Sequence, residues 1–173
     1  MNHDAYSDAY IRDIFTRSHT IAMVGASPNT SRPSYFAMKY LKQKGFRVIP
    51  VNPGQAGKEI LGEAAIASLA EIDEPVDIVD IFRISDAALA ITRDAIAIGA
   101  KVVWMQLGVR NDEAAELAEA AGLQVVMNRC PKIEYGRLSG ELAWAGVNSR
   151  TLSSRRQVLG AKGVQHRMLA RKA

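Results

Sequence analysis

The chain has 173 residues, of which 48% are hydrophobic and 23% are charged, the composition of an ordinary globular domain. It contains no run of 18 apolar residues, which excludes a membrane-spanning helix, and its first 15 residues carry acids and no apolar stretch, which argues against a secretory signal. The single cysteine, Cys130, cannot form an intramolecular disulfide, and the three histidines follow no metal-ligand spacing. We therefore expect a cytoplasmic protein without a bound metal.

The net charge of +4 conceals two unlike parts of the chain. Residues 150–173 contain seven Lys and Arg and no acid, whereas residues 1–149 contain 15 bases and 18 acids, a net charge of −3. A basic tail can attract nucleic acid, but this one has no aromatic side chain after Trp144 on which a base could stack. We expect an amphipathic segment here, with no nucleic-acid partner and no membrane partner.

The first half of the sequence alternates between helix-length and strand-length segments. A helix is expected at residues 8–17 and a strand at residues 21–24, followed by a helix at 33–44 that opens with Pro33, a residue suited to the first helical position. A second short apolar run, residues 48–51, also indicates a strand covered on both faces. After it, a short helix is expected at residues 63–72.

The second half repeats this alternation. Further strands are expected at residues 76–82, 102–107 and 124–127, and further helices follow Ser85 and Asn111 and end before Gly99 and Gly122. Strands that alternate with helices imply right-handed crossovers and a parallel sheet with helices on both faces. The pattern predicts a three-layer α/β/α, nucleotide-binding domain with a five-stranded parallel sheet, most simply in the order 3-2-1-4-5.

The loop after the first strand carries the clearest functional signal. In such a sheet the ligand binds at the carboxyl ends of the strands, and here Gly25 opens a small polar loop that leads through Arg32 into the helix at Pro33. Backbone N–H groups, the helix dipole and a guanidinium group together favour a phosphate. The loop and the first turn of the helix add four hydroxyl donors, Ser27, Thr30, Ser31 and Ser34. The alternative is that Gly25 only permits a tight turn and the hydroxyl groups cap the helix.

The same loop departs from the dinucleotide-binding pattern. Only the first glycine of G-x-G-x-x-G is present, and Asn52 followed by Pro53 stands at the end of the second strand, where an NAD enzyme places a carboxylate for the ribose. Arg32 or Lys58 could instead meet the 2′-phosphate of NADP. An NAD(P)-dependent oxidoreductase therefore stays open as an alternative.

Four segments resemble a known family. They read VGASPNTSRPSYFAMKYLKQKGFRVIPVNPG from Val24, VDIVDIFR from Val76, GAKVVWMQLGV from Gly99 and GLQVVMNRCPKIEY from Gly122. These segments are similar to the small, stand-alone CoA-binding domain proteins, and to the CoA-binding domain of the succinyl-CoA synthetase alpha subunit. The resemblance covers about residues 21–135 and all five expected strands in order.

The resemblance implies a Rossmann-like domain that binds coenzyme A or an acyl-CoA at the carboxyl ends of the strands. It implies that the phosphates are held by Gly25, Ala26, Ser27, Arg32 and Ser34. It also implies that the nucleotide is bordered by Asn52 and Pro53. On the same grounds, the adenosine or pantetheine side is lined by Phe82 and Arg83, and Gln106 lies near the pantetheine path. Arg32 and Arg83 also carry the positive charge that the pyrophosphate and 3′-phosphate of CoA require.

The resemblance also has a limit, because the larger ligases with this domain carry a phosphorylatable histidine and an ATP-grasp subunit for which this chain has no room. We therefore expect binding without catalysis. The expected division is an N-terminal helical extension at 1–20, the CoA-binding domain at 21–135, and a basic extension at 136–173 that is helical or partly disordered. A second alternative is a ligand-sensing regulatory module that acts through this tail on a protein partner or a second copy.

Three further residues invite a chemical role, and the plainer interpretation is favoured for each. Cys130 could form a mixed disulfide with CoA, but no histidine lies near it in sequence, so we expect an inert thiol. Asp77 and Asp80 are three residues apart in a strand, a spacing that points them to opposite faces and argues against a joint metal or acid–base site. For Asp80 we expect a buried partner, such as Arg83 or a backbone N–H.

Overall fold

The computed structural model describes residues 2–139 of the chain. Residues 2–135 lie within a compact unit, Met1–Tyr135, and this unit carries the features described below. The predictions made for the basic tail concern residues outside the described part, apart from residues 136–139. Within residues 2–139, none of the helices combines the length and apolar character needed to cross a membrane.

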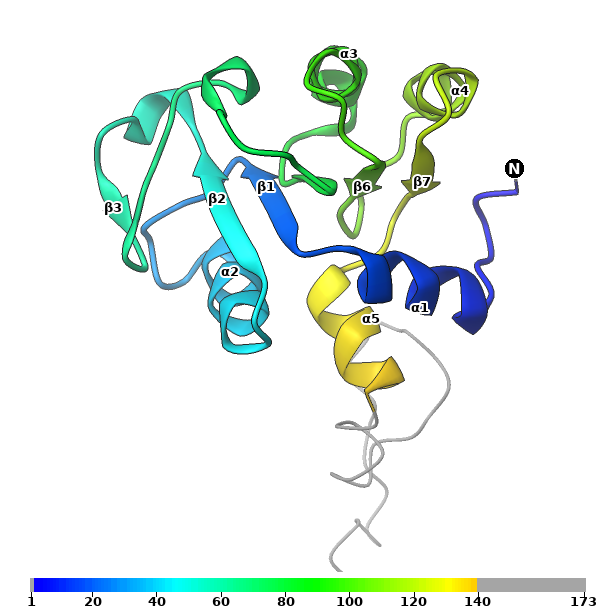
Figure 1. Cartoon of the computed structure of the whole chain (residues 1–173), viewed down its shortest axis with the longest axis horizontal. Helices are drawn as coiled ribbons and strands as arrows, with labels where there is room; N and C mark the ends of the chain where they lie inside the picture. The colour runs from blue at the N-terminus through cyan, green and yellow to red at the C-terminus, as the bar shows by residue number, and fades with distance from the viewer. Residues whose placement is uncertain (1, 140–173) are drawn as a thin grey trace, which may run out of the picture. The chain divides into compact units, whose positions relative to one another are not determined.

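A five-stranded parallel sheet forms the centre of the unit, with helices on both of its faces (Figure 1). Its strands are β1 (Thr20–Val24), β2 (Arg47–Val51), β5 (Ile78–Ile81), β6 (Val102–Met105) and β7 (Gln124–Val126). Helices α1 (Asp8–Arg17) and α2 (Pro33–Gln43) cover one face, and α3 (Ala88–Ala97) and α4 (Asp112–Ala120) cover the other (Figure 1). The predicted Rossmann-like α/β class with five parallel strands is confirmed.

The order of the strands along the sheet is β2-β1-β5-β6-β7. Counted along the chain, the third of the five strands therefore lies beside the first, whereas the expected order 3-2-1-4-5 places it beside the second. The connection between β2 and β5 explains the difference, because its Leu69 packs in the same core as Val79 and Ala95, on the α3 and α4 face. A right-handed crossover on that face moves the chain back across β1. The point where strand order reverses therefore lies between β1 and β5.

The segment between β2 and β5 is also less helical than its sequence suggests. The expected helix at residues 63–72 is wrong: the chain forms a small antiparallel hairpin of β3 (Glu59–Ile60) and β4 (Glu63–Ala64), followed by the 3-10 turn η2 (Leu69–Glu71). The turn of the hairpin needs positive φ at two successive residues, 52° at Leu61 and 82° at Gly62. A second turn, η1 (Pro53–Gln55), follows β2 directly.

The helix boundaries follow local capping chemistry. Ser7 accepts a hydrogen bond from the backbone N–H of Tyr10 and starts α1, and Asn111 accepts one from Ala114 and starts α4. Ser85 does not cap α3 as expected: it opens the 3-10 turn η3 (Ser85–Ala87), and its Oγ accepts a hydrogen bond from the N–H of Arg110. The last described helix, α5 (Pro131–Leu138), begins after the loop that follows β7.

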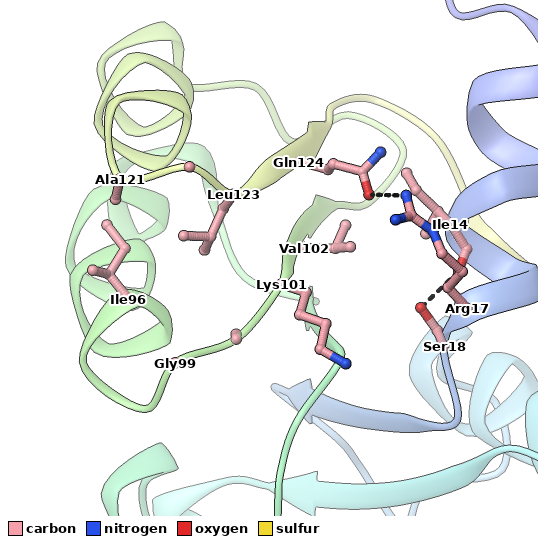
Figure 2. Close-up of a pocket in the computed structure, with 12 residues that line it drawn as sticks. Ile14, Arg17, Ser18, Ile96, Gly99, Lys101, Val102, Ala121, Leu123 and Gln124 are labelled. Carbon is pink, nitrogen blue, oxygen red and sulfur yellow. Dashed lines mark hydrogen bonds between the residues drawn. The ribbon is translucent and has the colours of Figure 1, made fainter.

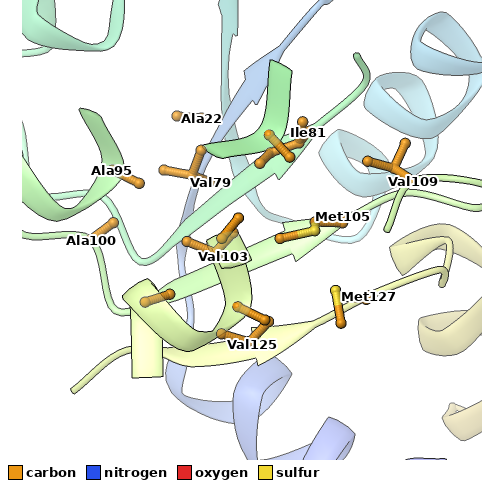
Figure 3. Packing of buried hydrophobic residues seen from close by; sticks show 14 of the residues in the cluster. Ala22, Val79, Ile81, Ala95, Ala100, Val103, Met105, Val109, Val125 and Met127 are labelled. Carbon is orange, nitrogen blue, oxygen red and sulfur yellow. The ribbon is translucent and has the colours of Figure 1, made fainter. Parts of the chain in front are cut away.

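The two faces of the sheet are packed differently. On the α3 and α4 face, small aliphatic side chains from the strands meet alanines of the helices (Figure 3). On the α1 and α2 face the core is aromatic, with the ring of Phe15 5.3 Å from those of Trp104 and Tyr135 and 6.1 Å from that of Phe46. Both cores hold the strand ends rigidly, which fixes the loops that follow them.

Candidate functional site

The loops after β1 and β5 lie directly against each other where the strand order reverses. Gly25 has a φ of +92°, and a Cβ atom there would lie 2.4 Å from the carbonyl oxygen of Phe82 and 3.1 Å from Cδ of Arg83. Only glycine tolerates both the left-handed backbone and this approach. Gly25 therefore brings the polar loop and Arg83 to one place, the position at which open α/β sheets bind ligands.

The polar loop is folded by its own side chains. The carboxamide oxygen of Asn29 accepts hydrogen bonds from the backbone N–H and the hydroxyl of Ser31, at 2.9 and 2.7 Å, and the hydroxyl of Ser27 accepts one from the N–H of Asn29. Arg32 occupies the N-cap position of α2 and makes no side-chain capping bond. In the first turn of α2, Pro33 has no N–H and the N–H of Tyr35 donates to the carbonyl of Arg32, so the N–H of Ser34 is the one that remains to favour an anion. Ser34 in that turn is buried, so it is less open to a ligand than Ser27.

Asn52 ties the loops after β1 and β2 together. Its side-chain amide donates a hydrogen bond of 2.7 Å to the carbonyl of Ala26, and its carboxamide oxygen accepts one of 3.0 Å from the N–H of Gly54. Ala26 itself is fully buried and contributes to the site only through its backbone. Since both ends of the Asn52 amide are used, this side chain does not replace the carboxylate that an NAD enzyme places at the same strand end.

Two hollows open along this edge of the sheet. The β1–β2 hollow, with a volume of about 530 Å³, is lined chiefly by residues that follow β1 and β2 and by one side of α3: Val24, Gly25, Val51, Asn52, Pro53, Gly54, Ala67, Ser68, Leu69, Arg83, Ala87, Ala90, Ile91 and Asp94. The β5–β6 hollow, of about 580 Å³, is lined by residues of α2, of the β5 and β6 ends and of the start of α5: Ser31, Pro33, Phe36, Ala37, Phe82, Arg83, Gln106, Leu107, Val109, Cys130, Lys132 and Ile133. Arg83 lines both hollows and lies between them.

The edge carries two arginines, one of which, Arg83, shares the β1–β2 hollow with the carboxylate of Asp94. Arg32 and Arg83 are both exposed, and among residues 2–139 neither has a carboxylate partner. A guanidinium group binds phosphate through two parallel N–H donors. Arg83 lines both hollows, whereas Arg32 lies between Ser31 and Pro33, which line the β5–β6 hollow.

The mouth of the β5–β6 hollow is apolar, a feature that sequence reasoning missed. Phe36 and Leu107 line it with 50% and 45% of their surfaces exposed. Helical spacing predicts Phe36 on the inner face of α2 with Ala37 and Leu41, but those two are buried whereas Phe36 is half exposed. The sequence does contain one signal for this apolar mouth, because Phe36 lies one turn after the polar loop. That signal can be interpreted only once β5 is known to be the strand beside β1.

A buried polar pair lies in the wall of the same hollow, with Gln106 lining it and Asp80 behind. Asp80 is fully buried, Gln106 is 5% exposed, and Nε2 of Gln106 lies 2.8 and 3.0 Å from the two carboxyl oxygens of Asp80. The expected partners of Asp80, Arg83 or a backbone N–H, are therefore replaced by a side-chain amide. Burial disfavours the charged carboxylate and raises the pKa of Asp80 to about 8, although the hydrogen bond from Gln106 opposes the shift.

Asp77 belongs to a different place. Its carboxylate accepts hydrogen bonds from the N–H groups of His19 and Thr20, at 2.7 and 3.0 Å, and from Nζ of Lys101 at 2.7 Å. Burial opposes its charge, but these donors outweigh it and lower the pKa of Asp77. Asp77 and Asp80 form no joint site, as expected. Among the residues that the structure describes, no group of three His, Cys, Asp or Glu side chains could hold a metal ion.

Cys130 lines the β5–β6 hollow immediately before α5. Burial raises the pKa of its thiol, while backbone N–H groups of Ile133 and Lys132 oppose the shift and the charge of Asp80 adds to it. A protonated thiol is a weak nucleophile.

A third hollow lies at the amino ends of the strands, which sequence reasoning did not single out (Figure 2). It has a volume of about 630 Å³, and Arg17, Lys101 and Gln124 provide its longest polar side chains. Both cations are already paired: Arg17 binds the carboxylate of Asp13 and lies 3.4 Å from the amide oxygen of Gln124, and Lys101 binds Asp77. This hollow therefore offers no unpaired cation to an anionic ligand.

Comparison with known proteins gives a consistent answer. The family model described as a CoA binding domain matches residues 19–136 of the chain. Among curated proteins, the chain is similar to YneT of Bacillus subtilis, an uncharacterised protein, with 38% identity over 129 residues that cover 75% of this chain and 94% of YneT.

Solved structures show the same likeness. A hypothetical protein from Pyrococcus horikoshii is 41% identical, with a TM-score of 0.76 over 81% of this chain and 97% of that one. A protein from Thermus thermophilus is 39% identical, with a TM-score of 0.74 over 77% of this chain and 99% of that one. A dinucleotide-forming acetyl-coenzyme A synthetase from Ca. Korarchaeum cryptofilum is 24% identical, with a TM-score of 0.56 over 63% of this chain and 25% of the synthetase; this last likeness is one of fold.

Proposed function

The chain belongs to the CoA-binding domain family, and from this premise we propose that it binds coenzyme A or an acyl-CoA at the carboxyl edge of the sheet, without catalysing a reaction of its own. One observation carries the proposal: Arg32 at the start of α2 and Arg83 beside the two hollows have no carboxylate partner among residues 2–139. CoA has a phosphorylated nucleotide at one end and a neutral, flexible pantetheine arm at the other. A cationic rim next to an apolar hollow suits both ends.

Each predicted residue has a role in this arrangement. The backbone of Gly25, Ala26 and Ser27, with Arg32 and the start of α2 at Ser34, would hold the phosphates. Asn52 and Pro53 would border the nucleotide from the β1–β2 hollow, and Arg83 would meet negative charge between the two hollows. Phe82 and Gln106 would line the path of the pantetheine arm in the β5–β6 hollow. These assignments are what the family resemblance implies, and the shape and charge of the edge support them.

The proposal of binding without catalysis rests on the chemistry of the pantetheine side. Cys130 is the single thiol of the chain, and its raised pKa disfavours the thiolate that a nucleophile needs. Asp80 is enclosed beneath Gln106, so its carboxyl group does not reach the hollow directly.

Isothermal titration of the full chain with CoA, acetyl-CoA and NADPH tests the proposed function. We expect heat of binding from both CoA ligands and weaker binding of NADPH, because the loop after β1 lacks the second and third glycines of the dinucleotide-binding pattern. Absence of binding at millimolar CoA, or a preference for NADPH, would overturn the proposal and favour the oxidoreductase alternative.

A further inference from the structure

Gln106 lines the β5–β6 hollow, and its amide contacts the fully buried carboxyl group of Asp80. Asp80 lies in the middle of β5, in register with Met23 on β1 and Trp104 on β6, neither of which carries charge. The charge of Asp80 is felt by Cys130, at the start of α5. Two cations line the same hollow, Arg83 after β5 and Lys132 at the start of α5. Among these neighbours, the hydrogen-bond partner of Asp80 is Gln106, which follows β6.

The amide of Gln106 has one donor end and one acceptor end, and Asp80 determines which of them it uses. When Asp80 is ionised it only accepts, so Nε2 of Gln106 must point toward it, and Oε1 is left for the hollow. When Asp80 is protonated it must donate its O–H, and Oε1 of Gln106 is the acceptor beside it. The amide then turns over, and its N–H faces the hollow.

We propose that Asp80 is a positioning residue that sets the polarity of the Gln106 amide at the ligand, and that the pair thereby distinguishes an acyl thioester from a free thiol. This inference rests on the proposed CoA site. With Asp80 neutral, the exposed N–H donates to a thioester carbonyl. With Asp80 ionised, the exposed Oε1 accepts from a thiol S–H and repels a carbonyl oxygen.

The sulfur end is the part of the ligand that meets this pair, because the hollow is polarised along its length. Arg83 lines it, as do Ser31 and Pro33 on either side of Arg32 at the start of α2, and this part attracts phosphates. The rest of the lining is mostly apolar and includes Gln106, whose amide contacts the buried Asp80. A linear ligand with charge at one end places its neutral end inside. The structure shows the arrangement that suits the ionised carboxylate, with Nε2 of Gln106 on both oxygens of Asp80. Because burial raises the pKa of Asp80 to about 8, protonation below that pH turns the amide over, and the site then favours the acyl-CoA thioester.

The test is the ratio of the dissociation constants of CoA and acetyl-CoA, measured by calorimetry on the full chain at pH 6.5 and pH 9. For the wild type we expect acetyl-CoA to be favoured at pH 6.5 and the preference to fall about three- to tenfold at pH 9, the effect of one hydrogen bond. Asp80→Asn both donates and accepts, as the neutral acid does, so it should keep the preference for acetyl-CoA at both pH values.

Asp77→Asn is the matched control, because it makes the same chemical change at the residue that directly precedes β5. Asp77 contacts His19, Thr20 and Lys101, away from the hollow, so this variant should retain the pH dependence of the wild type. Ionisation of the CoA thiol changes the ratio of dissociation constants by the same factor in the wild type and in each variant, so it cancels when a variant is compared with the wild type. Cys130→Ser should also retain the dependence, since serine can replace the thiol at a helix start.

The outcomes separate the inference from the proposed function. A constant ratio in the wild type, or a ratio in Asp80→Asn that changes with pH as the wild type does, would overturn the inference while leaving CoA binding in place. Loss of binding of both ligands by the wild type would overturn the proposed function and this inference with it. If Asp80→Asn does not fold, Gln106→Met replaces it: without the amide, the ratio should no longer depend on pH, and a persisting dependence would overturn the inference.

Discussion

Both edges of the parallel sheet carry cations beside hollows of similar size, about 530 and 580 Å³ at the carboxyl edge and about 630 Å³ at the amino edge. They differ in what those cations contact. At the amino edge, Arg17 and Lys101 bind carboxylates, whereas at the carboxyl edge Arg32 and Arg83 have no such partner within residues 2–139. The comparison teaches that cations without carboxylate partners, rather than the size of a hollow, distinguish the edge at which we propose anion binding.

Backbone geometry provides the largest expected difference between the edges. Gly25→Ala should destabilise the protein by about 3 kcal/mol, because the new methyl group collides with the carbonyl of Phe82 in addition to the strain at positive φ. Gly99→Ala at the amino edge has a φ of +72° and open space around it, so it should lose only about 1–2 kcal/mol. Urea unfolding of both variants measures this, and equal losses would show that the Gly25 contact is not critical.

The next largest effect is on ligand affinity. Arg32→Ala removes a charge-assisted phosphate contact and should weaken CoA binding by about 1.5–3 kcal/mol, roughly 10- to 150-fold. Its free energy of unfolding should change little, since Arg32 is exposed and makes no side-chain cap. Calorimetric titration with CoA measures the affinity, and an unchanged dissociation constant would show that the phosphates lie elsewhere.

A change at the amino edge should affect stability and leave the ligand alone. Asp77→Asn weakens the hydrogen bonds from Lys101, His19 and Thr20 and should lower the free energy of unfolding by about 2 kcal/mol at pH 7. Because these donors hold the pKa of Asp77 below its usual 3.8, its stabilisation is present above that value and is lost as the pH falls through the lowered pKa. Unfolding at pH 7 and pH 3 should therefore show a difference from wild type at pH 7 that shrinks at pH 3. A difference that persists at pH 3 would contradict this account.

The smallest effect is expected for an exposed ion pair. Arg17→Ala removes a surface pair with Asp13 and should change stability by about 0.5 kcal/mol or less, with CoA affinity unchanged. This variant is the counterpart of Arg32→Ala, one arginine being paired and the other free. Measured in the same titration, a comparable loss of CoA affinity in both variants would remove the distinction between the edges.

The fold was largely accessible from the sequence because its strongest determinants are local. The helix Asp8–Arg17 has a capping serine before it, and the buried strands are short apolar runs. The hairpin around Leu61 and the strand order were not accessible, because the first depends on a positive φ at a non-glycine residue and the second on which face Leu69 covers. Both are set by packing between distant segments.

The residues of the candidate site also differ in whether the sequence alone could identify them. Gly25, Arg32 and Asn52 could be identified because each directly follows a strand or precedes a helix. The pairing of Asp80 with Gln106 could not, because it depends on the register between β5 and β6, where two residues 26 positions apart meet across neighbouring strands. The engagement of Asn52 with Ala26 is likewise visible only once the loops are placed side by side.

Amide chemical shifts of the ¹⁵N-labelled chain, recorded during titration with CoA, test the central claim most directly. We predict the largest changes at Gly25, Ser27 and Arg32 and at Phe82 and Arg83, with the amides of Lys101 and Gln124 at the amino edge unaffected. Changes centred on the hollow beside Arg17 and Lys101, or no changes at either edge, would contradict the account.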